Sequence, residues 1–587
     1  MFRMIAGNAV ATNVVFACLV SLVCAPEPQA QAGEFRAGPP IYPNGVVAAD
    51  HPLASQAGVE ILRKGGNVVD AAVATAFALS VLRPGSSGIG GGGFMVIWNA
   101  RNKQAVVLDY RERAPQLATR NMFVDPKDRG TANVELSRKG HLAIAVPGTV
   151  AGLCYAVKHH GSLDLKTVLQ PAIRLAREGV PVDAYSRKEQ ALALLSFAEN
   201  ARYRKRFSML YEKYLNGGRP WKPGERFHSP QRKVLEIIAE QGADGFYRGP
   251  VAEALLAESR RGGGLLTRKD LAGMKPVIRK PIRGTFGRFQ IIGMPPPSSG
   301  GVALLETLNI LTAYERANPD SRLEKLGHNT PEYLHLLTEA LKHSFADRAE
   351  FLGDADFTPV PVKRLIGRQY ATKLATRIDV RQSKPMETYG RFLPVNDGGT
   401  THLSVIDRHG NAVACTETIN TVFGSFVVEP KYGIVLNNEM DDFAAVPGQP
   451  NVFGLIQSEA NAVEPGKKPL SSMSPTILVE DGKAVFALGA SGGPRIISTS
   501  LQVLLNLSRF KMSPTKAIRH PRIHHQWVPN TLYVEQPLFG KVRTALKQRK
   551  HAVRLRNDLS VCQAVSRSAE GLRGASDPRK HGRSAGY

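Results

Sequence analysis

The sequence predicts an α+β protein built from packed layers of helices and sheets. β-rich runs occupy 94–98 and 106–110, a mostly helical stretch extends from 163 to about 351, and β-rich sequence returns from 400 to 491. The strand-like runs are separated by hairpin loops rather than by βαβ crossovers, which favours antiparallel sheets. At 587 residues, 43% of them hydrophobic, the chain has apolar material for one large or two ordinary domains.

The first 32 residues have the pattern of a secretory signal. Arg3 precedes an apolar run from 14 to 23, and an Ala-Gln-Ala cleavage site follows at 30–32. The run is too short to span a bilayer, and no later stretch approaches the required length. We therefore expect a signal peptide at 1–32 and an exported protein, periplasmic or extracellular, without stable membrane insertion.

Charge and cysteine content argue against two other classes of protein. The formal net charge is +26, but the basic residues are scattered and no strand combines them with aromatic residues as an RNA-binding sheet would. We expect no nucleic-acid partner. After loss of the leader, Cys154, Cys415 and Cys562 are odd in number and far apart, which favours buried thiols over disulfides. No metal and no cofactor are expected.

Two helices and a glycine-rich segment are expected near the start of the mature chain. The first helix covers 54–62, and the second covers 70–82, is rich in alanine and should be buried on all sides. The segment 88–93 matches the dinucleotide fingerprint G-x-G-x-x-G, yet a helix precedes it and a strand follows, which reverses the order that the fingerprint needs. We reject NAD binding and interpret the glycines as backbone packed too closely for side chains.

A predicted hairpin places two threonines opposite each other. Strand-like runs at 401–406 and 412–419 are joined by a glycine-containing loop. A turn centred on His409 puts Thr418 directly opposite Thr400, with Cβ atoms within about 5.5 Å. Asn420 lies two residues on, on the same face. A bulge would shift this register by one, and a threonine pair that only stabilises the sheet is a common alternative.

The dipeptide Gly398-Gly399 favours a catalytic function for the threonine pair. A threonine hydroxyl is a weak nucleophile unless a base is adjacent, and the free α-amine of the same threonine can be that base. The peptide bond before Thr400 must then be cut. Glycine at 399 permits the strained backbone in which Thr400 Oγ1 attacks the preceding carbonyl, so that an ester forms and water releases it. Gly399–Thr400 is the predicted cleavage site.

Further motifs are distributed from about residue 47 to the carboxyl end. They include GGNVVDAAVA, GGGGFMVIW, LDYRERAP, MPPPSSGG, TTHLSVID, ETINTVFGS, LNNEMDDF, KKPLSSMSPT, ASGGPRI, RIHHQW and GASDPR. Together they resemble the γ-glutamyltranspeptidases of the N-terminal-nucleophile hydrolase superfamily. The resemblance implies a four-layer αββα sandwich. It also implies self-cleavage into a large subunit (33–399) and a small catalytic subunit (400–587), which stay together as one intertwined domain.

The family transfers γ-glutamyl groups from glutathione and related amides to water, amino acids or dipeptides. A γ-glutamyl group carries a free α-carboxylate and a free α-ammonium, and a specific pocket must hold both. Arg111 offers a guanidinium fork to the carboxylate, and Ser471 and Ser472 offer hydroxyls at the start of a strand. The resemblance places these residues in the same roles.

The ammonium needs acceptors. Glu439 and Asp442 are three residues apart on a turn, so both carboxylates can face one cation, and Asn420 can add its side-chain carbonyl. The resemblance again assigns this role to these positions.

The loop 491–494 is the candidate oxyanion hole, because it joins a strand to a helix. The N–H groups of Gly492 and Gly493 would lie near the positive end of that helix, and the resemblance matches both. His402 is interpreted as framing Thr400, although a Thr–His arrangement stays open as an alternative.

The Pro/Gly-rich segment 446–454, with Phe453 as an aromatic contact, is a candidate lid that would gate water against acceptor amines.

Two alternatives to an exported γ-glutamyltransferase and glutathione hydrolase remain open. A glutaryl acylase, such as a cephalosporin acylase, belongs to the same superfamily, but a glutaryl group has no ammonium for Glu439 and Asp442. A non-catalytic protein that binds γ-glutamyl peptides would remain an undivided chain.

Overall fold

Two stacked antiparallel sheets form the centre of the molecule. The computed structural model describes residues 40–127, 131–390, 400–447, 457–557 and 559–587. The first sheet has seven strands. Their order across the sheet is β20 (Ala585–Gly586), β1 (Gly45–Ala49), β9 (Thr401–Asp407), β10 (Ala412–Thr418), β2 (Gly92–Asn99), β3 (Gln104–Asp109) and β6 (Val277–Arg279).

The second sheet lies against the first, with β14 and β18 packed on β9. Its six strands run in the order β19 (Gly571–Ser576), β18 (Val561–Ser568), β14 (Lys483–Ser491), β13 (Thr476–Glu480), β8 (Phe289–Gly293) and β7 (Ile282–Phe286). The strands of both sheets pair in antiparallel fashion, as the hairpin spacing predicted.

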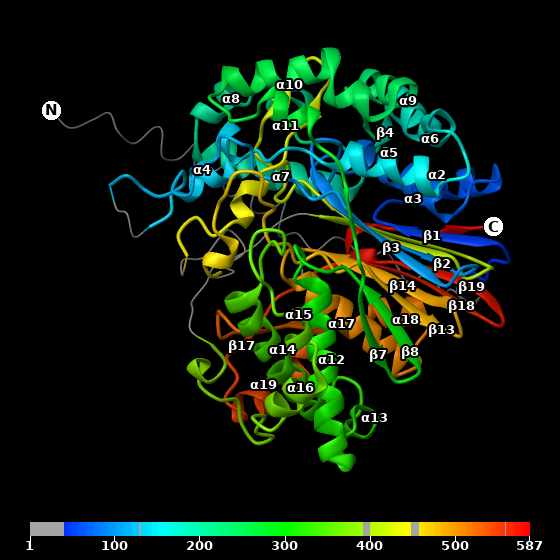
Figure 1. Cartoon of the computed structure of the whole chain (residues 1–587), viewed down its shortest axis with the longest axis vertical. Helices are drawn as coiled ribbons and strands as arrows, with labels where there is room; N and C mark the ends of the chain where they lie inside the picture. Colours follow the sequence, from blue (N-terminus) through cyan, green and yellow to red (C-terminus); the bar gives the residue numbers. More distant parts are fainter. Residues whose placement is uncertain (1–39, 128–130, 391–399, 448–456, 558) are drawn as a thin grey trace.

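One layer of helices covers the outer face of the first sheet (Figure 1). α2 packs on β1, α3 packs on β9 and β10, and α5 packs on β2, while α6 and α9 lie outside them. The helices of this layer are α2 (Pro52–Arg63), α3 (Val68–Leu82), α5 (Thr149–His160), α6 (Leu165–Glu178), α7 (Ala184–Glu199), α9 (Arg232–Tyr247) and α10 (Gly249–Arg261).

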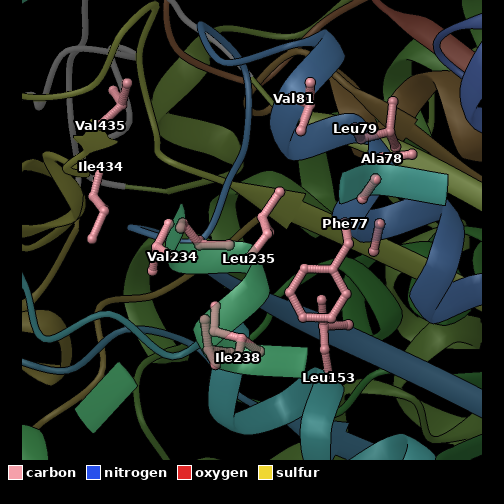
Figure 2. Packing of buried hydrophobic residues seen from close by; sticks show 14 of the residues in the cluster. Phe77, Ala78, Leu79, Val81, Leu153, Val234, Leu235, Ile238, Ile434 and Val435 are labelled. Atoms are coloured by element: carbon pink, nitrogen blue, oxygen red, sulfur yellow. The ribbon is translucent and has the colours of Figure 1, made fainter. Parts of the chain in front are cut away.

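α3 is the centre of that layer. All of its side chains are buried, which confirms the prediction from its alanine-rich composition. Figure 2 shows Phe77 of α3 packed near Leu153 of α5 and Ile238 of α9. Small side chains let the neighbouring helices and the sheet approach α3 closely, and the aromatic ring fills the remaining space.

A second layer of helices covers the outer face of the six-stranded sheet (Figure 1). α17 packs on β14, α18 packs on β18 and β19, and α12 contacts both α17 and β7. The helices of this layer are α12 (Gly300–Ala317), α14 (Pro331–Phe351), α16 (Arg368–Ala375), α17 (Arg495–Ser508), α18 (Pro514–Arg519) and α19 (Gln536–Gln548). The four layers are therefore helix, sheet, sheet and helix, the αββα sandwich that the family resemblance implied.

The sequence-based description of two stretches needs correction. The stretch expected to be mostly helical contains β6, β7 and β8, and the hairpin of β7 and β8 completes one edge of the second sheet. These strands have only three to five residues each, so they interrupt the helical pattern too briefly to dominate it. In the stretch expected to be β-rich, the described parts 436–447 and 457–475 are mostly irregular and carry pocket residues instead.

The glycine-rich segment before β2 brings backbones together, as predicted. A Cβ on Gly90 would collide with the carbonyl oxygen of Val435, and a Cβ on Gly91 with that of Thr418. The glycines therefore let the end of β10 lie directly against this turn.

The three cysteines within the described ranges are buried free thiols, as expected. In the same part of the chain, no helix has both the length and the apolar composition needed to cross a membrane.

Candidate active site

The hairpin of β9 and β10 aligns Thr400 with Thr418. The pairing runs from Ala412 opposite Ile406 to Glu417 opposite Thr401, without a bulge. Thr400 and Thr418 follow as the next opposing residues, and their Oγ1 atoms are 3.1 Å apart in a hydrogen bond. The predicted register is confirmed.

Asn420 fixes the orientation of the Thr418 hydroxyl. The backbone N–H of Asn420 donates to Thr418 Oγ1 at 2.8 Å, and the Asn420 side-chain amide donates to the carbonyl of Asn438 at 3.0 Å. Asn420 adopts a positive φ of 73°, a conformation that asparagine tolerates better than most residues. Because one lone pair of Thr418 Oγ1 is occupied by Asn420, its own proton is available to the Thr400 hydroxyl.

Arg111, at the end of β3, forms a buried ion cluster with two carboxylates. One of its terminal nitrogens binds Glu439, the other binds Asp442 Oδ2 at 2.5 Å, and Nε donates to the carbonyl of Pro469 at 3.2 Å. Glu439 and Asp442 lie on one 3₁₀ turn, η6 (Glu439–Asp442), so both carboxylates face one cation, which is the Arg111 guanidinium. Burial disfavours the charged guanidinium, but the two carboxylates outweigh it and raise the pKa of Arg111.

That pairing was not anticipated. The sequence assigned Arg111 to a substrate carboxylate and Glu439 and Asp442 to a substrate ammonium, whereas the structure joins these opposite charges directly. A zwitterion can occupy such a cluster if its carboxylate binds the guanidinium and its ammonium binds the carboxylates, so that the charges stay paired.

The segment that carries Ser471 and Ser472 is held by Ser299, which precedes α12, and by Arg348 of α14. Ser471 accepts a backbone hydrogen bond at its carbonyl from Ser299, and Ser472 Oγ accepts from Arg348 at 3.4 Å. Arg348 also donates to Ser299 Oγ at 2.9 Å. β13 begins at Thr476, so the two serines lie in the loop before this strand rather than at its start.

Arg348 was missed by the sequence reasoning. It is buried, and its second terminal nitrogen, Nη1, has no hydrogen-bond partner among the described residues. Burial lowers the pKa of Arg348 to about 10, and Asp442 opposes that shift. Within the described ranges, Arg348 thus adds an incompletely paired positive charge beside Ser472. No local sequence signal identifies it, because it is one charged residue within a long helix.

The predicted glycine loop connects β14 to α17. Gly492 and Gly493 have φ values of 125° and 57°, conformations that glycine adopts readily and other residues rarely do. Pro494 caps the amino end of α17, which begins at Arg495. The loop therefore lies at the amino end of the 14-residue helix α17, where the helix dipole is positive.

Most of these groups line one pocket. Its lining includes nine of the ten residues predicted for catalysis or substrate binding. The predicted residues that line the pocket are Arg111, Thr400, Thr418, Asn420, Glu439, Asp442, Ser471, Ser472 and Gly493. Gly492 is adjacent in the chain but is not part of the lining. Gly399 and most of the candidate lid at 446–454, including Phe453, lie outside the described residues.

Two further buried ionisable groups contact residues of the pocket, Lys580 at Thr400 and Glu112 at Arg111. Lys580 donates from Nζ to the carbonyl of Thr400 at 2.7 Å and pairs with Asp50 at 2.8 Å. Glu112 follows Arg111, and neither of its carboxylate oxygens has a hydrogen-bond partner among the described residues. Burial raises the pKa of Glu112 to about 7, which Arg111 partly opposes. The contacts of Lys580 with Asp50 and Thr400 could not be predicted from the sequence, because these residues are far apart along the chain.

The hydrogen bonds of His402 go to neighbouring hydroxyls of the two strands. Its ring nitrogens bind Thr416 at 2.7 Å and Ser404 at 3.0 Å, and burial lowers its pKa to about 3. The ring is therefore neutral and committed to structural partners, which weakens the Thr–His alternative.

One group away from the pocket has ligand types suited to a metal. His335, Glu339 and His551 bring donor atoms within 4.8 Å of one another. Glu339, however, is already paired with Lys342 at 2.8 Å and accepts from Tyr389. The carboxylate is thus neutralised by a buried ammonium, and a divalent cation would add uncompensated charge.

An αββα sandwich with a hydroxyl side chain at the start of a central strand defines the class of N-terminal-nucleophile hydrolases. The structure is similar to a solved cephalosporin acylase from Bacillus halodurans, with a TM-score of 0.80 and 29% identity over 96% of this chain and 99% of that chain. It is also similar to the γ-glutamyltranspeptidase of Helicobacter pylori, with a TM-score of 0.52 and 38% identity over 58% of this chain and 93% of that chain.

Sequence comparison identifies the family within this class. The family model described as gamma-glutamyltranspeptidase matches residues 54–587. The glutathione hydrolase proenzyme of Escherichia coli (strain K12) is 42% identical over 542 residues, which are 91% of this chain and 90% of that protein. The chain therefore belongs to the gamma-glutamyltranspeptidase family, and it is a γ-glutamyltransferase of the N-terminal-nucleophile class.

Proposed function

We propose that this chain is an exported, self-processing enzyme that takes γ-glutamyl groups from glutathione and passes them to water, an amino acid or a dipeptide. The observation that carries the proposal is the single pocket in which a paired threonine hydroxyl faces a buried guanidinium and two carboxylates. That combination suits a substrate with one reactive amide and an α-amino acid head group.

The first step is cleavage of the Gly399–Thr400 bond. Thr400 Oγ1 attacks the carbonyl of Gly399, its proton passes to the departing nitrogen, and water hydrolyses the ester. The products are a large subunit ending at 399 and a small subunit 400–587. Both contribute strands to the seven-stranded sheet, since β9 lies between β1 and β10, so the subunits stay associated. The relatives' designation as proenzymes supports this division.

The new α-amine of Thr400 then acts as the base. It takes the proton from Oγ1 as the oxygen attacks the γ-carbonyl of the donor, and Thr418 Oγ1 holds the nucleophile in place. The proton passes to the leaving amine, which is cysteinylglycine when glutathione is the donor. Water or an acceptor amine subsequently attacks the ester on Thr400 and restores the free hydroxyl.

Substrate binding uses the ion cluster. The α-carboxylate binds Arg111 and the hydroxyls of Ser471 and Ser472, while the α-ammonium binds Glu439 and Asp442. Each charge of the zwitterion thereby gains an opposite partner, and no charge is left unpaired in the buried pocket.

Asn420 adds its side-chain oxygen to the ammonium site. The N–H groups of Gly492 and Gly493 stabilise the negative oxygen of the tetrahedral intermediate. Removal of one such donor typically costs a few kcal/mol of barrier.

A glutaryl acylase is the second candidate, because the cephalosporin acylase is structurally similar along nearly the whole chain. A glutaryl donor has no ammonium, so it would leave Glu439 and Asp442 without their substrate partner. Sites built for a polar group commonly reject analogues that lack it by large factors.

Release of nitroaniline from matched donors separates the candidates. With γ-glutamyl-4-nitroanilide we expect rapid release, and with glutaryl-4-nitroanilide release at least roughly 100-fold slower. Thr400→Ala is the control and should neither divide nor release nitroaniline. Equal or faster release from the glutaryl compound would favour the acylase, and binding without release by an undivided chain would favour a binding protein.

A further inference from the structure

A buried lysine reaches the backbone of the nucleophile from the carboxyl end of the chain. Lys580 lies at the end of the 3₁₀ turn η8 (Pro578–Lys580), and its Nζ donates to the carbonyl oxygen of Thr400 at 2.7 Å. The same ammonium pairs with Asp50, which follows β1, at 2.8 Å. Lys580 is 1% exposed and Asp50 is fully buried.

Covalent geometry places this ammonium close to the amine that cleavage would free. The nitrogen and the carbonyl oxygen of one residue are separated by three bonds and therefore by less than about 4 Å. Since Lys580 Nζ is 2.7 Å from the Thr400 oxygen, it lies within about 6 to 7 Å of the Thr400 nitrogen. A like charge at this distance in a buried site disfavours protonation of the amine.

We propose that Lys580 is a positioning residue whose ammonium keeps the freed α-amine of Thr400 in its neutral, proton-accepting form. This inference rests on the proposed division before Thr400. An ordinary α-amine has a pKa of about 7.7 to 8.0 and would be mostly protonated at neutral pH, where it cannot act as a base. A fixed cation nearby favours the neutral amine, because the protonated amine would lie close to a second positive charge.

Asp50 moderates this effect without cancelling it. The Lys580 ammonium is shared between an ion pair with Asp50 at 2.8 Å and the hydrogen bond to the Thr400 carbonyl at 2.7 Å, so it contacts both groups at once. Burial disfavours the ammonium, but Asp50 together with Tyr185 and Glu189 outweighs that effect, so the pKa of Lys580 is raised. Lys580 is therefore charged throughout the neutral range.

Other charged or titratable groups face this region from α7, β9, β10, the residue after α3 and the pocket, and each has its own partner. Arg83 is paired with Asp183, Glu189 accepts from Ser86, and Glu417 accepts from Tyr110. Tyr185 lies under the Lys580 ammonium, and His402 binds Thr416. Arg111 binds Glu439 and Asp442 and lies 3.9 Å from Glu112, whose pKa burial raises to about 7. Lys580 contacts the Thr400 backbone directly, through the hydrogen bond from its Nζ to the carbonyl oxygen.

The test is the pH dependence of kcat/KM for γ-glutamyl-4-nitroanilide in three variants. Lys580→Gln keeps a donor for the Thr400 carbonyl but removes the charge, so its acidic limb should move up by roughly one pH unit. Lys580→Arg keeps the charge and should stay near the wild type. Asp50→Asn removes the opposing negative charge and should move the acidic limb to lower pH.

Each profile is measured on protein whose division before Thr400 has been verified by mass. Absence of division or of nitroaniline release in the wild type would overturn the proposed function itself. An active wild type whose acidic limb is unchanged in Lys580→Gln would overturn only the role of Lys580. Shifts of Lys580→Gln and Asp50→Asn in the same direction would also overturn it, because a merely structural contact does not respond to the sign of the charge. If Lys580→Gln fails to divide, the direction of the Asp50→Asn shift decides.

Discussion

The hydrogen bond between the two threonines can be tested with a substitution that preserves shape. Thr418→Val replaces the hydroxyl by a methyl group of similar size at a site that is 3% exposed. It removes the contact to Thr400 Oγ1 at 3.1 Å and leaves the N–H of Asn420 without its acceptor. The lost hydrogen bond is worth about 1 kcal/mol, and a buried unpaired donor costs about 1 to 3 kcal/mol.

If about 2 to 3 kcal/mol of this cost appears in the transition state, kcat/KM falls roughly 30- to 150-fold. We expect the loss mainly in kcat, because Thr418 contacts the nucleophile rather than the charges that bind the substrate. Division of the precursor should slow as well. Initial rates with γ-glutamyl-4-nitroanilide measure the effect, and Thr418→Ser, which restores the hydroxyl, is the matched control. A Thr418→Val enzyme within twofold of the wild type would refute this role for the threonine pair.

Three further changes follow from the same geometry. Arg111→Lys should raise KM for γ-glutamyl donors by about 10- to 100-fold in initial-rate assays, because an ammonium cannot replace a fork that binds two carboxylates; an unchanged KM would contradict it. Ser472→Ala should raise KM about 10-fold with kcat within a few-fold, and a loss confined to kcat would count against a binding role. Burial raises the pKa of Glu417 to about 8, although the hydrogen bond from Tyr110 opposes this shift. Glu417 therefore stays protonated in the folded state up to about pH 8, whereas in the unfolded state it loses its proton above about pH 4.3. The free energy of unfolding therefore falls as the pH rises toward 8. Between pH 5 and pH 8, the thermal midpoint should fall less in Glu417→Gln than in the wild type, and equal falls would contradict this.

Local patterns were enough to predict the catalytic hairpin. Alternation with a period of two and a glycine-containing turn determine which residues face each other, and the pairing of Thr400 with Thr418 followed from them. The common orientation of Glu439 and Asp442 could also be predicted, because the two residues are three positions apart on one short turn.

Contacts between distant segments were beyond the sequence. The pairing of Arg111 with Glu439 joins the end of β3 to a turn more than three hundred positions later. Lys580 and Asp50 come from opposite ends of the chain, and Arg348 is one charged residue within a long helix. These side chains meet only when the chain has folded, and the hydrophobic periodicity of the sequence does not indicate such contacts.

The strands β6, β7 and β8 were missed for a different reason. Each is short, and the stretch around them is dominated by helical periodicity. Their strand character comes from pairing with β3 and β13, which are far away in the sequence.

The most direct measurement follows one undivided sample over time. Aliquots of freshly purified precursor are analysed in parallel by intact mass with amino-terminal sequencing and by nitroaniline release. We expect the release rate to rise in proportion to a fragment that begins at Thr400 and ends at Tyr587. Full release by material that remains a single chain would contradict the requirement for a freed threonine amine.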